Sequence, residues 1–207
     1  MLAHDQYFCA AGVLRCLEFE ATPGLRTSCS WPAAVTAGVH PQFTTYYQVS
    51  TLLSRMLMCD PQAGRFAMAP GGMHTLLIGT YAGVNEAGRP YAATTADIMA
   101  GAIGAFSHAD GINTGGQSRT PICQLPNIEH TEQSFPILFL YRKELPDSGG
   151  AGKYRGGLSA ESCFIPHNTD VITQDTLSSG NATPTSPGMM GGYPSTTNAY
   201  MFRRNSN

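Results

Sequence analysis

Residues 147–157, with the sequence DSGGAGKYRGG, have the composition of a loop that could bind an anion. Five of these residues are glycines, which let a backbone bend sharply and turn its amides outward. Two are basic, Lys153 and Arg155. Amides and basic side chains together favour a phosphate or a carboxylate. The candidate anion-binding residues are Asp147, Gly149, Gly150, Gly152, Lys153 and Arg155.

Neither of two common glycine motifs fits this loop. A P-loop requires a glycine where the chain has Asp147, and Ser or Thr where it has Tyr154. A dinucleotide fingerprint starting at Gly150 requires a glycine where the chain has Arg155. The alternative to an anion site is a structural turn that carries surface charges.

Arg155 has two possible roles in such a loop. Its planar guanidinium could bridge loop carbonyls and pair with Asp147, or it could direct a bidentate fork at an anionic intermediate. We expect the structural role, because a loop this rich in glycine needs a side chain to fix it.

A second group of polar residues could supply acid–base or metal-ligand chemistry. These candidate catalytic residues are Asp97, His108, Asp110 and Glu129. Structural roles remain open for two of them, since Asp97 could cap a helix and Asp110 could form an Asx turn.

Hydrophobic patterning predicts the elements around these residues. Residues 135–141 form an apolar run typical of a strand buried on both faces, and 158–165 resemble a further strand. Helical spacing at 41–58, with Thr44 or Thr45 as its cap, predicts a core or subunit-contact helix. Other expected elements are a helix at 7–19, a hairpin of 73–81 with 90–94, a packing anchor at Trp31 and a structural His74.

Composition restricts the class of protein. The 207 residues include 37 Gly or Pro, 13% are charged, and the net charge is −2. This composition predicts a loop-rich protein and offers no basic surface for nucleic acid. Together with the expected elements, it predicts an α+β, mixed, glycine-rich and loop-rich domain with hairpins and a few packed helices. No apolar run is long enough to span a membrane and no signal peptide is recognisable, so we expect a cytoplasmic protein.

The six cysteines do not indicate a metal centre. None forms a Cys-x-x-Cys pair, and the six histidines lack compact ligand spacing. We therefore expect reduced thiols and no metal bound by this chain.

Taken in order, these motifs resemble the hydantoinase B/oxoprolinase family. The resemblance rests on Asn-x-Glu-x-x-Glu at 127–132, the Phe-Pro-led apolar run, the loop at 147–157 and a late glycine-rich run at 187–194. It covers roughly residues 7–195 but only the later part of a family subunit, so it implies a fragment or truncated product. Residues 139–144 lean toward the ketone carboxylases.

The resemblance implies a function in an ATP-dependent complex. A separate A-type subunit would bind ATP and Mg²⁺ and phosphorylate an amide or enol oxygen, after which a cyclic amide is hydrolysed or a ketone is carboxylated. The remainder of the B-type subunit would be a further partner in a hetero-oligomer, and its N-terminal portion could hold a divalent metal. The alternative is a catalytically silent assembly piece.

The expected organisation is one domain in two parts. Residues 1–172 would form the C-terminal portion of the family domain, and 173–207 a Gly/Pro/Ser-rich loop or tail that belongs to it in the full assembly.

Overall fold

The structure is a computed structural model, which describes Arg15, Glu18 and residues 20–25, 28–34, 39–71, 77–97, 101–115, 125–177 and 180–204. The chain divides into two compact units, residues 1–67 and 68–207. The helix expected at 7–19, apart from Arg15 and Glu18, and the expected role of His74 lie outside the described residues. The division expected at residue 172 stays a prediction. Among the described helices, none combines the length and hydrophobicity that crossing a membrane requires.

The first unit contains α2 (Val39–Met58) and the short 3-10 helix η2 (Gly64–Phe66). The predicted helix at 41–58 is confirmed, but it begins at Val39, so Thr44 and Thr45 lie inside it and do not cap it. The packing role expected for Trp31 is wrong, because 94% of this residue is exposed. Several apolar residues of α2 are exposed as well: Val49, Leu52, Leu53 and Met56.

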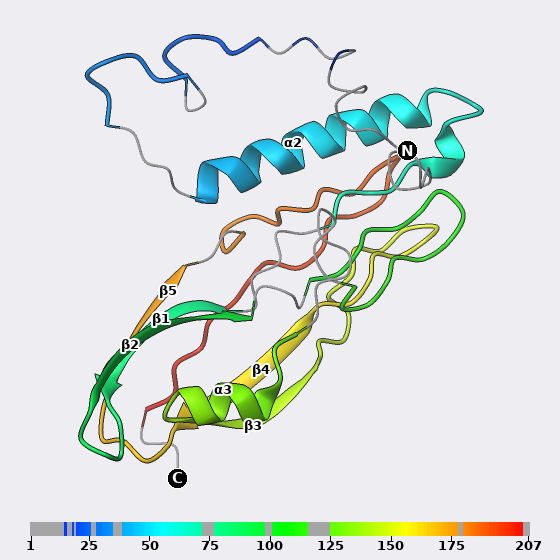
Figure 1. Ribbon diagram of the computed structural model, residues 1–207. Helices are drawn as coiled ribbons and strands as arrows, with labels where there is room; N and C mark the ends of the chain where they lie inside the picture. The colour runs from blue at the N-terminus through cyan, green and yellow to red at the C-terminus, as the bar shows by residue number, and fades with distance from the viewer. Residues whose placement is uncertain are drawn as a thin grey trace. The chain divides into compact units, whose positions relative to one another are not determined.

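In the second unit, β1 (Leu77–Val84), β2 (Pro90–Asp97) and β5 (Ile172–Leu177) form an antiparallel sheet in the order β2-β1-β5. β1 and β2 make the curved green hairpin of Figure 1. Asn85 closes the turn, since its Oδ1 accepts hydrogen bonds from the amides of Ala87 and Arg89. The predicted hairpin is confirmed from residue 77 onward, and both strands run three residues further than expected. β5 was not predicted.

The second sheet pairs β3 (Ile137–Glu144) with β4 (Ala160–Pro166), and α3 (Ile128–Ser134) precedes β3. Both strands were predicted, but the expected burial of the apolar run on both faces is wrong. Ile137 is 2% exposed, whereas Leu138 and Leu140 are 36% and 55% exposed. Alternating burial is typical of a sheet with one covered face.

The first residues of the family-like signature build α3 and its junction with β3. Asn127 caps the helix, because its side-chain oxygen accepts a hydrogen bond from the amide of His130 at 3.2 Å. Glu132 accepts a hydrogen bond from the amide of Phe139 at 2.7 Å, beside the register shift between Phe139 and Tyr141. A carboxylate thus satisfies a backbone donor at a strand irregularity.

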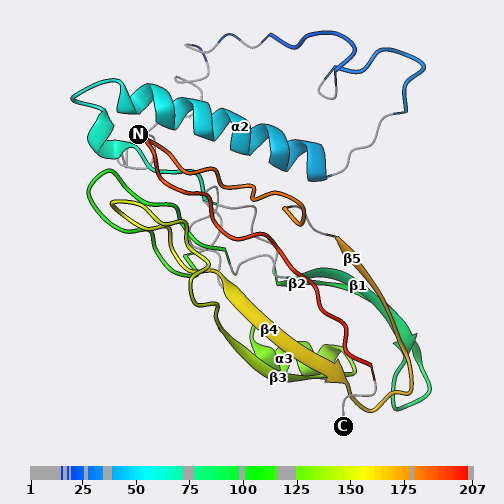
Figure 2. The same ribbon diagram turned by 180° about the vertical axis from the view of Figure 1, so that it is seen from behind.

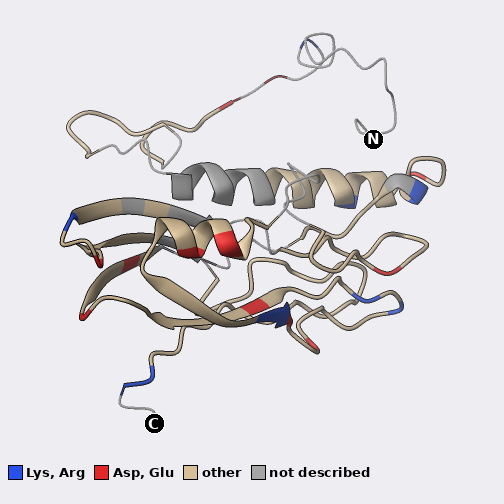
Figure 3. Ribbon diagram, turned by 60° about the horizontal axis from the view of Figure 1, so that its bottom comes forward, with Lys and Arg blue, Asp and Glu red and all other residues tan. Residues whose placement is uncertain are grey.

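Aromatic side chains join the two sheets. Tyr81 on β1 is fully buried, and its ring centroid lies 5.7 Å from that of Phe135 and 6.0 Å from that of Phe164 on β4. Phe139 on β3 packs against Phe164 at 5.9 Å. Helices combined with small antiparallel sheets give the predicted α+β class. Figure 3 shows that most of the ribbon is uncharged, with acidic residues on α3.

Candidate functional site

The loop containing the glycine signature connects the end of β3 to the start of β4. It runs beside residues 101–115, as Figure 2 shows in yellow and green. Backbone hydrogen bonds join the two segments: Gly157 N to Ile103 O, Gly111 N to Arg155 O, and Thr114 N to Leu158 O, all between 2.8 and 3.0 Å. Residues 186–196 pack against the same loop, since Tyr193 N donates to Ala151 O at 2.8 Å and Thr196 N donates to Ser148 O at 3.2 Å.

Three of the five loop glycines are explained by close packing of these backbones. A Cβ on Gly157 would collide with the carbonyl oxygen of Ile112, and a Cβ on Gly150 would collide with that of Tyr193. A Cβ on Gly149 would collide with the carbonyl oxygen of Gly156 within the loop itself. Each of these obstacles is backbone, which cannot swing away as a side-chain end can. Glycine is therefore required here by contact between main chains.

The sharp bend of the loop is made by Asp147. Its φ is 57°, in the left-handed region that aspartate tolerates better than most residues, while no loop glycine has such a φ. The next residue, Ser148, is 1% exposed. Its Oγ donates to Leu145 O at 2.7 Å and accepts from Ser159 N at 2.8 Å, so it ties the two ends of the loop together.

Arg155 is held by the protein on several sides. Its amide donates to Asp110 Oδ1 at 3.0 Å, and its Nε lies 3.7 Å from Asp110 Oδ2. Its Nη1 donates to Asn113 Oδ1 at 3.0 Å and to Gly156 O at 2.9 Å. The expected pairing with Asp147 is wrong, because the carboxylate opposite Arg155 is that of Asp110.

The other candidates for anion binding remain accessible. Lys153 is exposed, and its Nζ lies 5.3 Å from the centroid of the Tyr154 ring. Within the described part of the chain, the backbone amides of residues 149–154 have no hydrogen-bond partner. This short run of free donors, beside one exposed cation, keeps the capacity to bind an anion.

A cavity of about 90 Å³ lies beside the loop. Four stretches contribute to its wall, within residues 69–71, 102–105, 149–159 and 186–195. Gly149, Gly150 and Tyr154 are part of the wall, whereas Lys153 and Arg155 are not. No charged side chain occurs among the described residues that line it, so backbone groups and uncharged side chains, among them those of Ile103, Met189 and Tyr193, define the cavity.

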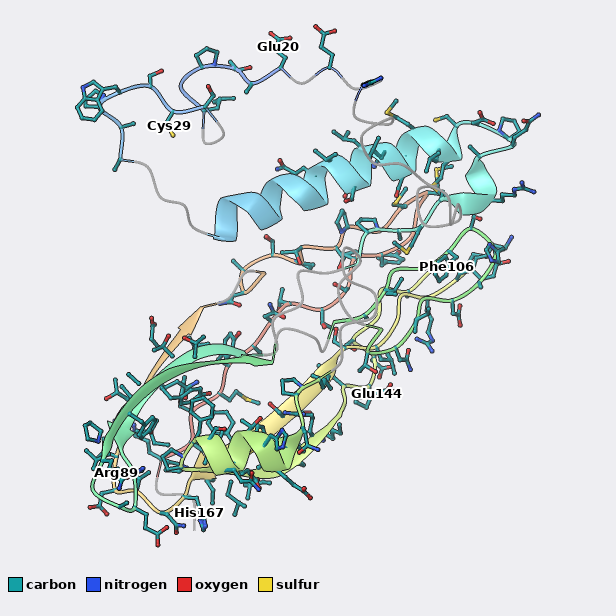
Figure 4. All side chains as sticks on the ribbon, in the orientation of Figure 1. Glu20, Cys29, Arg89, Phe106, Glu144 and His167 are labelled. Carbon is teal, nitrogen blue, oxygen red and sulfur yellow. The ribbon has the colours of Figure 1, made fainter. Side chains whose placement is uncertain are left out.

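The candidate catalytic residues whose side chains are described, His108, Asp110 and Glu129, do not form one cluster. Asp97 ends β2, and its side chain is not described. His108 is exposed in the turn closed by the hydrogen bond from Phe106 N to Ala109 O, whereas Glu129 is exposed in the first turn of α3. Asp110 accepts a hydrogen bond from Arg155 N, 45 residues away, in place of an Asx turn. Figure 4 labels Phe106 in the turn and Glu144 at the end of β3.

The described residues do not fit a metal ion. Wherever the side chains are described, no three of His, Cys, Asp and Glu gather closely enough to coordinate one. Cys29 and Cys59 are exposed thiols outside any disulfide, and Cys163 is a half-buried one.

Sequence reasoning missed Asn113, Glu144 and Ser148. The first two form a side-chain hydrogen bond, from Asn113 Nδ2 to Glu144 Oε2 at 3.1 Å. Asn113 Oδ1 also accepts from Leu158 N at 2.9 Å. The partners of Asn113 lie 31 to 45 residues away in the chain, so no local pattern could have indicated them.

Two curated proteins are similar to this chain. The acetone carboxylase alpha subunit of Xanthobacter autotrophicus is 30% identical over 120 residues, which cover 58% of this chain and 15% of that subunit. The acetophenone carboxylase delta subunit of Aromatoleum aromaticum is 29% identical over 146 residues, which cover 68% of this chain and 20% of that subunit. The matched part thus spans a fifth or less of each relative.

A solved structure is similar as well. Nucleotide-free acetone carboxylase, from a study of ATP-dependent acetone carboxylation, superimposes with a TM-score of 0.59 and 27% identity over 65% of this chain and 17% of that one. The sequence model of hydantoinase B/oxoprolinase matches residues 1–207. The chain therefore belongs to the hydantoinase B/oxoprolinase family.

Proposed function

We propose that the chain is part of the B-type subunit of an ATP-dependent enzyme that carboxylates a ketone or hydrolyses a cyclic amide. The observation that carries this proposal is the family match along the whole chain, together with two relatives that are carboxylase subunits. The remainder of such a subunit, and an A-type subunit that binds ATP and Mg²⁺, would complete the enzyme. Residues 1–172 and 173–207 would then belong to one domain of the assembly.

Within that enzyme, the loop at 147–157 would contact the anionic part of a phosphorylated or carboxylate-bearing intermediate. Support comes from the amides of residues 149–154, which have no hydrogen-bond partner among the described residues, and from the exposed Lys153. Fixed amides that point at developing negative charge stabilise it without reorganising. Arg155 would act indirectly, because its Nε faces Asp110 and its Nη1 already donates to Asn113 Oδ1 and Gly156 O.

A catalytically silent assembly role is the second candidate. It is favoured by the wall of the cavity, which lacks charged side chains among the described residues, and by the exposed apolar side chains of α2. Under this proposal the glycine-rich loops serve only to pack one segment of a larger complex.

ATP turnover separates the two candidates. An A-type subunit and the remainder of the B-type subunit are purified with and without the chain, and ATP hydrolysis is measured with acetone and bicarbonate, acetophenone and bicarbonate, hydantoin, or 5-oxoproline. Substrate-dependent turnover that requires the chain supports the enzymatic role. Turnover by the A-type subunit that is the same with and without the chain contradicts it.

A pair of lysine variants tests the loop within an active complex. Lys153→Ala should weaken the apparent affinity for substrate by roughly tenfold, the scale of one charge-assisted contact. Lys143→Ala is the matched control, because Lys143 lies on β3 beside Glu161 with an Nζ–Oε2 distance of 3.5 Å. Equal effects of the two substitutions on substrate affinity would show that Lys153 does not contact the substrate.

A further inference from the structure

The Asn113 side chain connects three segments of the second unit. Its Oδ1 accepts two hydrogen bonds, from Arg155 Nη1 and from Leu158 N, and its Nδ2 donates to Glu144 Oε2. An amide oxygen has two lone pairs, so the acceptor capacity of Asn113 is fully used. One side chain thereby joins residues 101–115 to the end of β3 and to both sides of Gly157.

Asp110 completes this arrangement from the same segment. Its two carboxylate oxygens lie near the amide and the Nε of Arg155, at 3.0 and 3.7 Å. The carbonyl oxygen of Arg155 in turn accepts from Gly111 N at 2.8 Å. Backbone and guanidinium of Arg155 are thus fixed together, which leaves the loop little freedom at its C-terminal end.

The loop N-terminal to Arg155 depends on this anchor. Gly156 N donates to Gly150 O at 2.9 Å, so the position of Gly156 sets that of Gly150 across the loop. Between these two residues, no described residue accepts a hydrogen bond from the amides of Ala151, Gly152, Lys153 and Tyr154. Any displacement of Arg155 would therefore change where those free donors point.

We propose that Asn113 is a positioning residue for the loop at 149–154: it holds Arg155 so that the free amides face an anionic ligand. The inference rests on the proposed function, in which this loop takes an anion. It assigns a role to Asn113, which does not itself reach the ligand, and it makes Glu144 the residue that orients the Asn113 amide.

A reversal of hydrogen-bond polarity tests the proposal. Asn113→Asp retains the shape and both acceptor bonds but places a carboxylate against Glu144. Adding Glu144→Gln restores a donor–acceptor pair with its direction reversed, because the side-chain amide introduced at position 144 can donate to the new carboxylate. The matched control is Glu161→Gln, which removes a carboxylate of β4 outside this arrangement.

Inorganic phosphate is the probe, titrated into the full chain. Asn113→Asp should weaken phosphate binding by roughly tenfold, the scale on which a supporting hydrogen bond changes ligand affinity. The double variant should return to within about twofold of the wild type. The ¹⁵Nε resonance of Arg155 and the amide resonances of residues 149–154 should shift in Asn113→Asp and return in the double variant.

The outcomes are distinguishable. A fall in Tm with unchanged phosphate affinity and unchanged loop resonances would overturn the positioning role. If Asn113→Asp does not fold, Arg155→Lys replaces it, since lysine keeps the charge but cannot occupy the Nε and Nη1 positions together; unchanged loop resonances in that variant would also overturn the proposal. A wild-type chain that binds no phosphate contradicts the anion site, while the resonances still decide whether Asn113 sets the loop.

Discussion

Tyr81 and Gly157 represent two ways of filling the interior of the second unit. Around Tyr81, packed aromatic rings fill the space between the backbones of the two sheets. Around Gly157, main chains touch directly and side chains are excluded. The first kind of interior loses stability when a substitution removes atoms, and the second loses stability when a substitution adds atoms.

This difference changes how the glycine signature is interpreted. Five glycines beside Lys153 and Arg155 suggested a loop shaped for a ligand, but Gly149, Gly150 and Gly157 are explained by backbone contacts inside the protein. A loop rich in glycine can thus reflect close backbone packing. Its contacts with a ligand depend instead on which backbone amides have no partner in the protein.

The largest effect is expected in the aromatic region. Tyr81→Ala removes a fully buried ring that contacts Phe135 and Phe164, and should lower the free energy of unfolding by about 3–5 kcal/mol. Urea denaturation followed by circular dichroism measures it. Leu140→Ala, on the exposed face of β3, should cost well under about 1 kcal/mol. Similar costs for both variants would mean that the rings do not form the core.

Adding one methyl group tests the glycine region. Gly157→Ala places a Cβ against the carbonyl group of Ile112 and should cost about 3 kcal/mol, because two backbones must separate. Gly152→Ala is the control, since its Cβ would lie 3.1 Å from Tyr154 O and 3.6 Å from Gly192 Cα, contacts that a small shift relieves. Thermal unfolding of the two variants compares them. Equal Tm values would show that close backbone packing does not govern these positions.

The two carboxylates of the signature, Glu129 and Glu132, should differ in how much they contribute to the free energy of unfolding. Glu132→Ala leaves the amide of Phe139 without its acceptor and should cost about 2 kcal/mol, typical of a hydrogen bond to a charged group. Glu129→Ala loses only a favourable charge in the first turn of α3, with an expected cost of about 0.5 kcal/mol. Urea titration measures both. A larger loss at Glu129 would reverse the assignment of the structural residue.

The smallest effect concerns a surface pair on β3 and β4. The hydrogen bond from Tyr141 OH to Glu161 Oε1, 2.8 Å long, is the main cause that lowers the pKa of Glu161. A lowered folded-state pKa contributes stability that is present above the unfolded pKa and is lost as the pH falls through the folded one. Tyr141→Phe should therefore raise the pKa of Glu161, which carboxyl ¹³C NMR measures. It should also reduce the loss of folding stability as the pH falls. A pKa of Glu161 that stays unchanged in this variant would contradict the assignment.

Local patterns predicted most of the strands. Helical spacing identified α2, a strand candidate followed by turn residues identified β1 and β2, and apolar runs identified β3 and β4. The polar segment before β3 was not recognised as α3, although Asn127 is a typical cap, because seven residues are too few for a periodic signal. β5 was missed because its sequence, ITQDTL, is polar and becomes a strand through pairing with β1.

Sequence patterns located the glycine-rich loop but not the contacts that hold it, and its role in anion binding stays a prediction. The loop and its basic residues were located from sequence, whereas the partner of Arg155 was assigned to Asp147, the carboxylate of the same loop. Asp110 fills that role from 45 residues away, and Asn113 reaches the loop over similar separations. Contacts between distant segments depend on how the loops pack, which composition does not encode.

The pairing of β5 with β1 has a consequence for synthesis of the chain. β1 acquires its first partner, β2, almost at once, but its other edge is completed by residues made roughly one hundred positions later. At ribosomal rates of about 5–20 residues per second, that edge waits on the order of 5–20 s before β5 emerges. During this interval the nascent hairpin presents unpaired backbone groups to neighbouring chains. Folding of this unit should thus depend more on chaperones at the ribosome than its small sheets would suggest.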